Sequence, residues 1–170
     1  NFDEIKAYCK ENNMTLPELV YKFESEDIKE YLEHIRFVMA SACLNGLSKT
    51  GELPGGLHVL RKAKQLFSSK IENELANTHE LRTAASYAFA VSEENACGGT
   101  IVTAPTCGSC GVLPSVLFHL QKFYNFSNQR ILRALATAGI FGTVVKHNAS
   151  VSGAEVGCQG EVGVACAMAA

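Results

Sequence analysis

The sequence predicts an all-α fold, a compact multi-helix domain whose helices are joined by glycine-rich loops. Apolar residues recur at the spacing of a helix face along most of the chain. Three glycine-rich stretches, residues 49–57, 93–111 and 146–166, interrupt this period, and only residues 100–103 have strand-like chemistry. Hydrophobic residues make up 47% of the chain and charged residues 19%. The length of 170 residues is typical of one domain, which can bury roughly 70% of its unfolded surface.

The first third of the chain reads as amphipathic helices. Residues 2–10 predict a short helix, and a capping box at Thr15–Glu18 predicts the start of a second one, with proline in its first turn. Apolar residues continue at helical spacing from Ile28 to Cys43. Ser25 is a second capping candidate, which would divide this region into two helices.

The middle of the chain predicts two more helices after the break at residues 49–57. Apolar residues resume a helical period over residues 59–67, which Ile71 and Leu75 extend. Residues 77–80, Asn-Thr-His-Glu, resemble a capping signal, and an alanine-rich helix is expected to follow through Phe89.

The last part of the chain predicts helices around the second and third glycine-rich stretches. Residues 93–111 read as an ordered loop, followed by a helix over residues 112–123 and another that Ser127 caps. Residues 162–170 are small and predict a closely packed helix. Ala170 falls inside that helix with no capping residue after it, so we expect a C-terminally truncated fragment of a longer domain.

Composition argues against two classes of partner. The net charge is −2 with the signs well mixed, so we expect neither a nucleic-acid-binding nor an anionic-membrane-binding surface. The most apolar window, residues 131–145, contains Arg133 and is too short to span a bilayer. Seven cysteines and a polar first segment indicate reduced thiols, and hence a cytoplasmic location.

Two of the cysteines form a C-x-x-C motif, Cys107 and Cys110. Three interpretations stand: a dithiol redox centre, half of a zinc site, or two small residues in a tight loop. No second C-x-x-C and no histidine pair lies at a suitable spacing for zinc. Spacing alone favours the structural interpretation.

Cys158 has a different setting, between Gly157 and Gly160 and flanked by Glu155 and Glu161. If a helix begins near Gly160, the thiolate of Cys158 lies beside the positive end of the helix dipole. The remaining cysteines and histidines are expected to pack or to lie at the surface. Packing is expected for Cys9, Cys43, Cys97 and Cys166, and surface or satisfied positions for His34, His58, His79, His119 and His147.

Several segments together resemble one enzyme family. Residues 152–170, SGAEVGCQGEVGVACAMAA, closely resemble the signature of the iron–sulfur-dependent L-serine dehydratases, alpha chain. Four other parts of the chain resemble further motifs of the same family. They are KHNAS at 146–150, TAPT at 103–106 with GSCGVLP at 108–114, ENACGG at 94–99, and LPGGL at 53–57 with RKA at 61–63. These motifs stand in the order of the family and cover residues from about 50 to 170.

The resemblance implies a lyase that converts L-serine to pyruvate and ammonia without pyridoxal phosphate, in amino-acid degradation and gluconeogenesis. It implies a [4Fe–4S] cluster with three cysteine ligands and one iron open to substrate. Cys158 matches one ligand, and the other two belong to family motifs that this sequence does not contain. Residues 1–170 would then be the N-terminal part of the alpha-chain catalytic domain. The fragment is expected to be inactive, with the cluster absent or incomplete.

The family pattern also suggests substrate contacts. Thr106, Lys146, Asn148, Ser150 and Glu155 are the candidates for binding the substrate, while the catalytic base is unassigned and expected in the beta chain or domain. Many members carry asparagine where this chain has Cys107, which adds a possible contact between Cys107 and the cluster. The expected partners are L-serine, the beta chain or domain, and further copies in a homo- or hetero-oligomer.

Rival interpretations remain open at this point. The same chemistry could act on L-cysteine with loss of sulfide. The C-x-x-C motif could instead make the chain a thiol redox or zinc module, and a catalytically silent scaffold is the third class.

Overall fold

The computed structural model describes all 170 residues and is all-α, as the sequence predicts. Its helices are α1 (Phe2–Glu11), α2 (Leu16–Phe23), α3 (Ile28–Ser48), α4 (Ala63–Ser68), α5 (Ala76–Ala96), α6 (Val112–Phe123), α7 (Asn128–Asn148), α8 (Gly153–Cys158) and α9 (Val164–Ala169). A single π-helical turn, η1 (Gln159–Gly163), joins α8 to α9. The only β-type pairing is an isolated bridge between Glu52 and Leu60.

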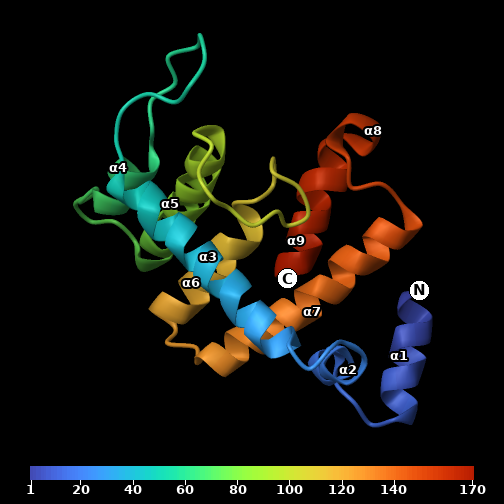
Figure 1. Ribbon diagram of the computed structural model, residues 1–170. Coiled ribbons are helices and arrows are strands. Elements are labelled where there is room, and N and C mark those ends of the chain that lie inside the picture. Colours follow the sequence, from blue (N-terminus) through green and yellow to red (C-terminus); the bar gives the residue numbers. More distant parts are fainter.

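Two apolar clusters hold the helices together. The larger one packs α3, α6 and α7 around Leu32, Leu117 and Leu135. The smaller one joins α3, α5 and α6 around Cys43, Val91 and Phe118. Figure 1 shows α3 crossing α5 on one side and α7 running diagonally to the other side, with α9 lying between α6 and α7. The core therefore lies along α3 and α6, which contribute residues to both clusters.

The crossing of α3 and α5 is very close because Gly46 lies at it. A Cβ atom added at Gly46 would lie 2.3 Å from the carbonyl oxygen of Ala90 and 2.6 Å from its Cα atom. The absence of a side chain at residue 46 thus lets the backbones of the two helices approach each other directly.

Capping residues place several helix starts where the sequence predicts them. The Glu18 carboxylate accepts hydrogen bonds from the backbone N–H of Thr15 at 2.7 Å and from its hydroxyl at 2.6 Å. These bonds lower the pKa of Glu18, the hydroxyl bond being the larger cause. The hydroxyl oxygen of Ser127 accepts from the backbone N–H of Arg130 at the start of α7. The division before α3 is also confirmed, although Asp27 rather than Ser25 precedes the helix.

Three local predictions are wrong. Residues 59–62 and 69–75 are not helical, so the helix expected over residues 59–75 shrinks to α4. The alanine-rich helix starts at Ala76, so residues 77–80 form its first turn and do not cap it. The loop expected over residues 93–111 is shorter, because α5 continues to Ala96 and leaves residues 97–111 as the loop. None of the helices is both long and apolar enough to cross a lipid bilayer.

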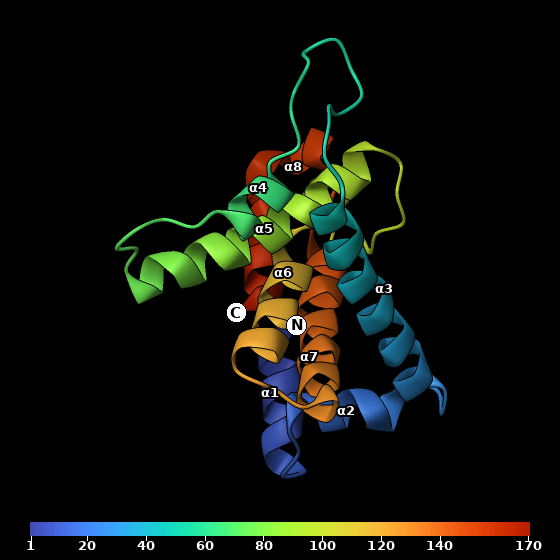
Figure 2. The ribbon, with the colours of Figure 1, turned by 90° about the vertical axis from the view of Figure 1, so that its left-hand side faces the viewer.

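Two loops project from this body. Residues 49–62 extend outward in Figures 1 and 2, held at their base by hydrogen bonds from Leu53 to Val59 and from Arg61 to Gly51. The other loop, residues 69–75, is tied to α5 by the guanidinium of Arg82, which donates to both oxygens of Glu74 at 2.7 Å.

Candidate functional site

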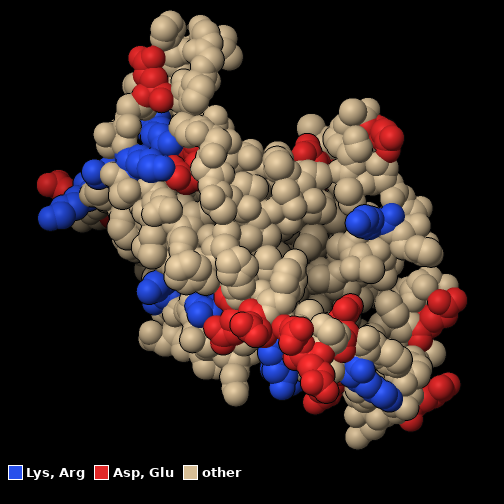
Figure 3. Space-filling view, in the orientation of Figure 1, with Lys and Arg blue, Asp and Glu red and all other residues tan.

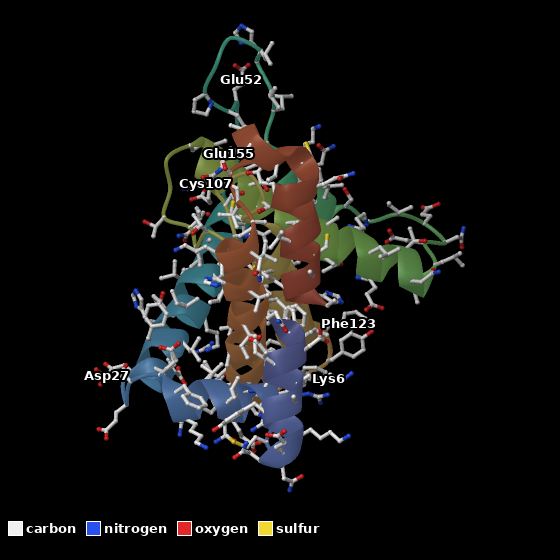
Figure 4. The ribbon with its side chains drawn as sticks, turned by 90° about the vertical axis from the view of Figure 1, so that its right-hand side faces the viewer. Lys6, Asp27, Glu52, Cys107, Phe123 and Glu155 are labelled. Atoms are coloured by element: carbon white, nitrogen blue, oxygen red, sulfur yellow. The ribbon has the colours of Figure 1, made fainter.

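The segments with unusual chemistry gather at one end of the molecule. Figure 4 shows Glu52, Cys107 and Glu155 at this end and Lys6 and Asp27 at the opposite one. We call it the motif end and define it as residues 49–63, 93–111 and 150–163. Figure 3 shows that the molecule is hollowed here, between the part built by α4 and α5 and the part that carries α8.

A buried ionic cluster joins the first two segments of the motif end. The Arg61 guanidinium donates to Glu94 at 3.1 Å, and Lys49 donates to the other Glu94 oxygen at 2.6 Å. The side chains of Arg61 and Glu94 are only 5% and 4% exposed, so the two charges neutralise each other away from water. Their pairing fixes the base of the projecting loop against the end of α5.

Glu93, next to this pair, sets where α4 begins. Its Oε1 atom accepts from the backbone N–H groups of Lys62 at 2.5 Å and Ala63 at 3.1 Å. These are donors that the first turn of a helix leaves unpaired. Arg61 also donates to the sulfur of Cys97 at 2.9 Å. Cys97 is exposed, so the prediction that it packs in the core is wrong.

The loop that follows is held from α5. The side chain of Asn95 donates to the carbonyl oxygen of Cys107 at 3.1 Å, and the hydroxyl of Ser109 donates to the carbonyl oxygen of Ala104 at 3.4 Å. The peptide bond between Ala104 and Pro105 is cis. Hydrogen bonds to the carbonyls therefore order a segment that has no helix or strand of its own.

The two cysteines of the C-x-x-C motif differ sharply. Cys107 is exposed, whereas Cys110 is fully buried and burial raises the pKa of its thiol to about 11. Both are free thiols. No three histidine, cysteine, aspartate or glutamate side chains lie close enough together to hold a metal ion. This arrangement favours the structural interpretation of the motif over a dithiol or zinc centre.

The third segment of the motif end, residues 150–163, contacts the loop of residues 97–111 through the carboxylate of Glu161. The hydroxyl of Thr106 donates to Oε1 of Glu161, and Thr106 also lies 3.1 Å from the hydroxyl of Ser109. Gly108 and Gly153 both face the same carboxylate. Residues that are 55 positions apart in the chain are thus in direct contact at the motif end.

The other predicted substrate contacts lie away from this junction. Lys146 and Asn148 are exposed in the last turn of α7, and the Asn148 amide donates to the carbonyl oxygen of Val144 at 2.8 Å. Ser150 accepts from the backbone N–H of Ser152 at 3.0 Å, and Glu155 is exposed. The structure joins Thr106 to Glu161 and does not join these four residues to that pair. The sequence offers Glu155 and Glu161 alike as carboxylates that could orient the loop or the substrate ammonium, and of these two Glu161 is the one that contacts Thr106.

Cys158 lies at a break in the final helical stretch. Gly157 has φ 65° and ψ −166°, and Cys158 resumes helical angles, so a new run begins there rather than near Gly160. The positive φ explains the glycine, because residues with a Cβ atom are strained in this conformation. Cys158 is exposed, and so is Cys166, so the prediction that Cys166 faces the core is wrong.

A complete cluster of the implied kind does not fit these residues alone. It needs three cysteine ligands, and the chain brings no such set of donors together. Cys158 is an exposed thiol that fits one ligand position. An exposed thiol at Cys158 and the hydrogen-bonded junction of Thr106 and Glu161 are thus features of the motif end.

A separate cavity lies far from the motif end. It has a volume of about 540 Å³ between α1, α2, α3 and α7, and its walls are mostly apolar, including Leu19, Val20, Leu135 and Ile140. The polar residues of its lining include Glu4, Tyr8, Glu24 and Tyr31, none of which belongs to the segments of the motif end.

Comparison with known proteins gives one consistent result. A family model described as serine dehydratase alpha chain matches residues 4–170. The chain is 40% identical to an L-serine dehydratase of Haemophilus influenzae over 100% of its own length and 39% of that protein. It is 43% identical to L-serine dehydratase TdcG of Escherichia coli over 98% of the chain and 39% of that protein. It is 40% identical to an L-serine dehydratase of Streptomyces coelicolor over 99% of the chain and 38% of that protein. The chain thus spans about two fifths of the length of these relatives.

Proposed function

Because the chain belongs to the serine dehydratase alpha-chain family, we propose that it forms part of an enzyme that deaminates L-serine to pyruvate and ammonia. The observation that supports this most strongly is the motif end. Segments that are far apart in the sequence meet there through Arg61–Glu94, Asn95–Cys107 and Thr106–Glu161.

The reaction must overcome two obstacles. Hydroxide is a poor leaving group, and the Cα proton of serine is weakly acidic. We propose that Cys158 supplies one ligand to a [4Fe–4S] cluster whose remaining ligands lie outside residues 1–170. When bound, such a cluster offers an open iron as a Lewis acid for the departing hydroxyl, without pyridoxal phosphate.

In this proposal, the residues of this chain bind and orient the substrate. The exposed side chains of Lys146, Asn148 and Glu155 and the half-buried side chain of Ser150 remain candidates for binding L-serine if another part of the protein closes over them. In the same proposal, residues 1–170 are the N-terminal part of the alpha-chain catalytic domain. A beta chain or domain completes the cytoplasmic oligomeric enzyme and contributes the base. Residues 1–170 alone are then inactive.

The test uses the complete enzyme that carries this chain, reconstituted without oxygen with iron and sulfide. We expect broad visible absorption and serine-dependent pyruvate. Cys158→Ser is expected to abolish the absorption. Turnover should fall by more than the roughly 10–100-fold that follows loss of an outer partner of a metal ligand.

Cys166→Ser is the matched control, because Cys166 is an exposed thiol eight residues further on. It is expected to keep both signals. A Cys158→Ser enzyme with normal absorption and turnover would refute the ligand assignment. If the enzyme released sulfide from L-cysteine faster than ammonia from L-serine, L-cysteine would be the preferred substrate instead of L-serine. Stoichiometric iron and sulfide in residues 1–170 alone would point to Cys107, Cys110 or Cys166 as further ligands.

A further inference from the structure

The Glu161 carboxylate sits where two glycine-rich segments touch. Glu161 lies on η1, three residues after Cys158, and accepts a hydrogen bond from the Thr106 hydroxyl. A Cβ atom added at Gly108 would lie 2.5 Å from Glu161 Oε1, and one added at Gly153 would lie 2.9 Å from Oε2. The carboxylate therefore fills the space that side chains at both positions would otherwise occupy.

This contact also fixes the protons of the neighbouring hydroxyl groups. A threonine hydroxyl has one proton and two lone pairs. Since the proton of Thr106 goes to Glu161, only the proton of Ser109 is available for the 3.1 Å contact between the two hydroxyl groups, and Ser109 shares this proton with the carbonyl oxygen of Ala104 at 3.4 Å. Thr106 can then accept further hydrogen bonds but cannot donate to a substrate carboxylate.

We propose that Glu161 is a positioning residue that holds the Cys158 segment against the loop of residues 103–111 and orients the Thr106 hydroxyl. The contact itself stands on the structure, whereas its consequence for turnover rests on the proposed function. Glu161 thereby sets the place of Cys158 relative to the loop. Glu155, an exposed carboxylate six residues earlier, does not share this role.

The first experiment measures hydrogen exchange of backbone amides in the complete enzyme by mass spectrometry. Glu161→Ala is expected to speed exchange in residues 103–111 and 158–163. The increase should be about tenfold or more, the factor expected from losing one hydrogen bond to a charged group. Thr106→Val should give the same increase, and the double variant should add nothing to either single change. Glu155→Ala is the control and should leave both segments unchanged.

The glycines provide an independent route to the same answer. Gly108→Ala and Gly153→Ala should displace the carboxylate and reproduce the faster exchange. Gly163→Ala is their control, because nothing lies within 4 Å of a Cβ atom there. If Glu161→Ala does not fold, Thr106→Val and Gly108→Ala still provide the exchange measurement. Unchanged exchange in residues 103–111 in these variants would overturn the proposal.

The second experiment separates positioning from general stability. With L-serine, Glu161→Ala should lower kcat about 10–100-fold. Glu161→Gln, whose amide oxygen still accepts from Thr106, should restore most of it, whereas Glu161→Asp is too short and should not. Equal losses in Gln and Ala variants would overturn the positioning role. An enzyme with no serine turnover would instead refute the proposed function and leave the exchange result standing.

Discussion

Replacing Gly46 with alanine tests the packing of α3 against α5. The new Cβ atom would lie 2.3 Å from the carbonyl oxygen of Ala90, whereas ordinary van der Waals contact begins at 3.4 Å. The obstacle is backbone in the middle of a helix and cannot rotate away. The two helices must therefore separate by about 1 Å, which disturbs the cluster around Cys43 and Val91.

Two opposing effects determine how much Gly46→Ala changes the free energy of unfolding. Alanine in place of glycine inside a helix gains about 1 kcal/mol of helix propensity. Forcing one extra carbon into a packed interface costs about 1–3 kcal/mol or more, and here it meets rigid backbone. With the packing cost near the upper end of this range and the propensity gain subtracted, we expect Gly46→Ala to lose about 1–2 kcal/mol of unfolding free energy, which lowers Tm by about 2–8 °C for a chain of this length.

Gly139→Ala is the matched control because it makes the same change inside another long helix, α7. Nothing lies within 4 Å of a Cβ atom at Gly139. Only the propensity gain remains, so we expect stabilisation by about 0.5–1 kcal/mol. Urea and thermal unfolding followed by circular dichroism measure both variants. A Gly46→Ala protein as stable as Gly139→Ala would show that α3 and α5 do not approach this closely.

Two further predictions concern charge and thiol burial. The Arg82 hydrogen bonds lower the pKa of Glu74 to about 2 from an ordinary value of 4.5. Because the folded pKa is the lower one, this stabilisation is complete above about pH 4.5 and is lost as the pH falls toward 2. The urea midpoint of Glu74→Gln should therefore fall less between pH 7 and pH 3 than that of the unchanged protein, and an equal fall would contradict the pairing. Burial also raises the pKa of Cys43 to about 12 and that of Cys110 to about 11. Iodoacetamide at pH 8 should label the exposed thiols of Cys97, Cys107, Cys158 and Cys166 in the folded protein, and Cys43 and Cys110 only after unfolding, as read by mass spectrometry. Labelling of Cys110 as fast as Cys107 would revive the dithiol interpretation.

The helices that sequence predicts best are those with local start signals. Thr15 with Glu18, and Ser127, satisfy helix N–H groups with their own side chains, so a few neighbouring residues suffice to place the boundary. The start of α4 depends instead on Glu93, which reaches it from α5 across some 30 positions of the chain. No local pattern contains that information, and the apolar period of residues 59–75 was a misleading substitute.

The sequence allowed the family of the site to be predicted, but not which of its side chains are exposed or contact one another. The signature around Cys158 identifies the family, and Gly157 marks the break that precedes this residue. The sequence predicts packing for Cys97 and Cys166, in the latter case because alanines flank it, yet both are exposed. Sequence also offers Glu155 and Glu161 on equal terms. Which of them reaches Thr106 depends on the break at Gly157 and on the π-helical turn, which together rotate the later residues relative to α8.

The weak attachment of α1 divides the molecule by local stability. None of its residues is buried, and its contacts with the rest of the molecule include the ring contacts of Phe2 with Phe141 and of Tyr8 with Phe23 and the hydrogen bond from Lys22 to Tyr8. Segments with so few buried contacts open at a small fraction of the global unfolding free energy. Opening of α1 removes one wall of the 540 Å³ cavity and gives water, or another apolar chain, access to the side chains of α2 and α7. The apolar side chains that line this cavity therefore become accessible without unfolding of the rest of the molecule.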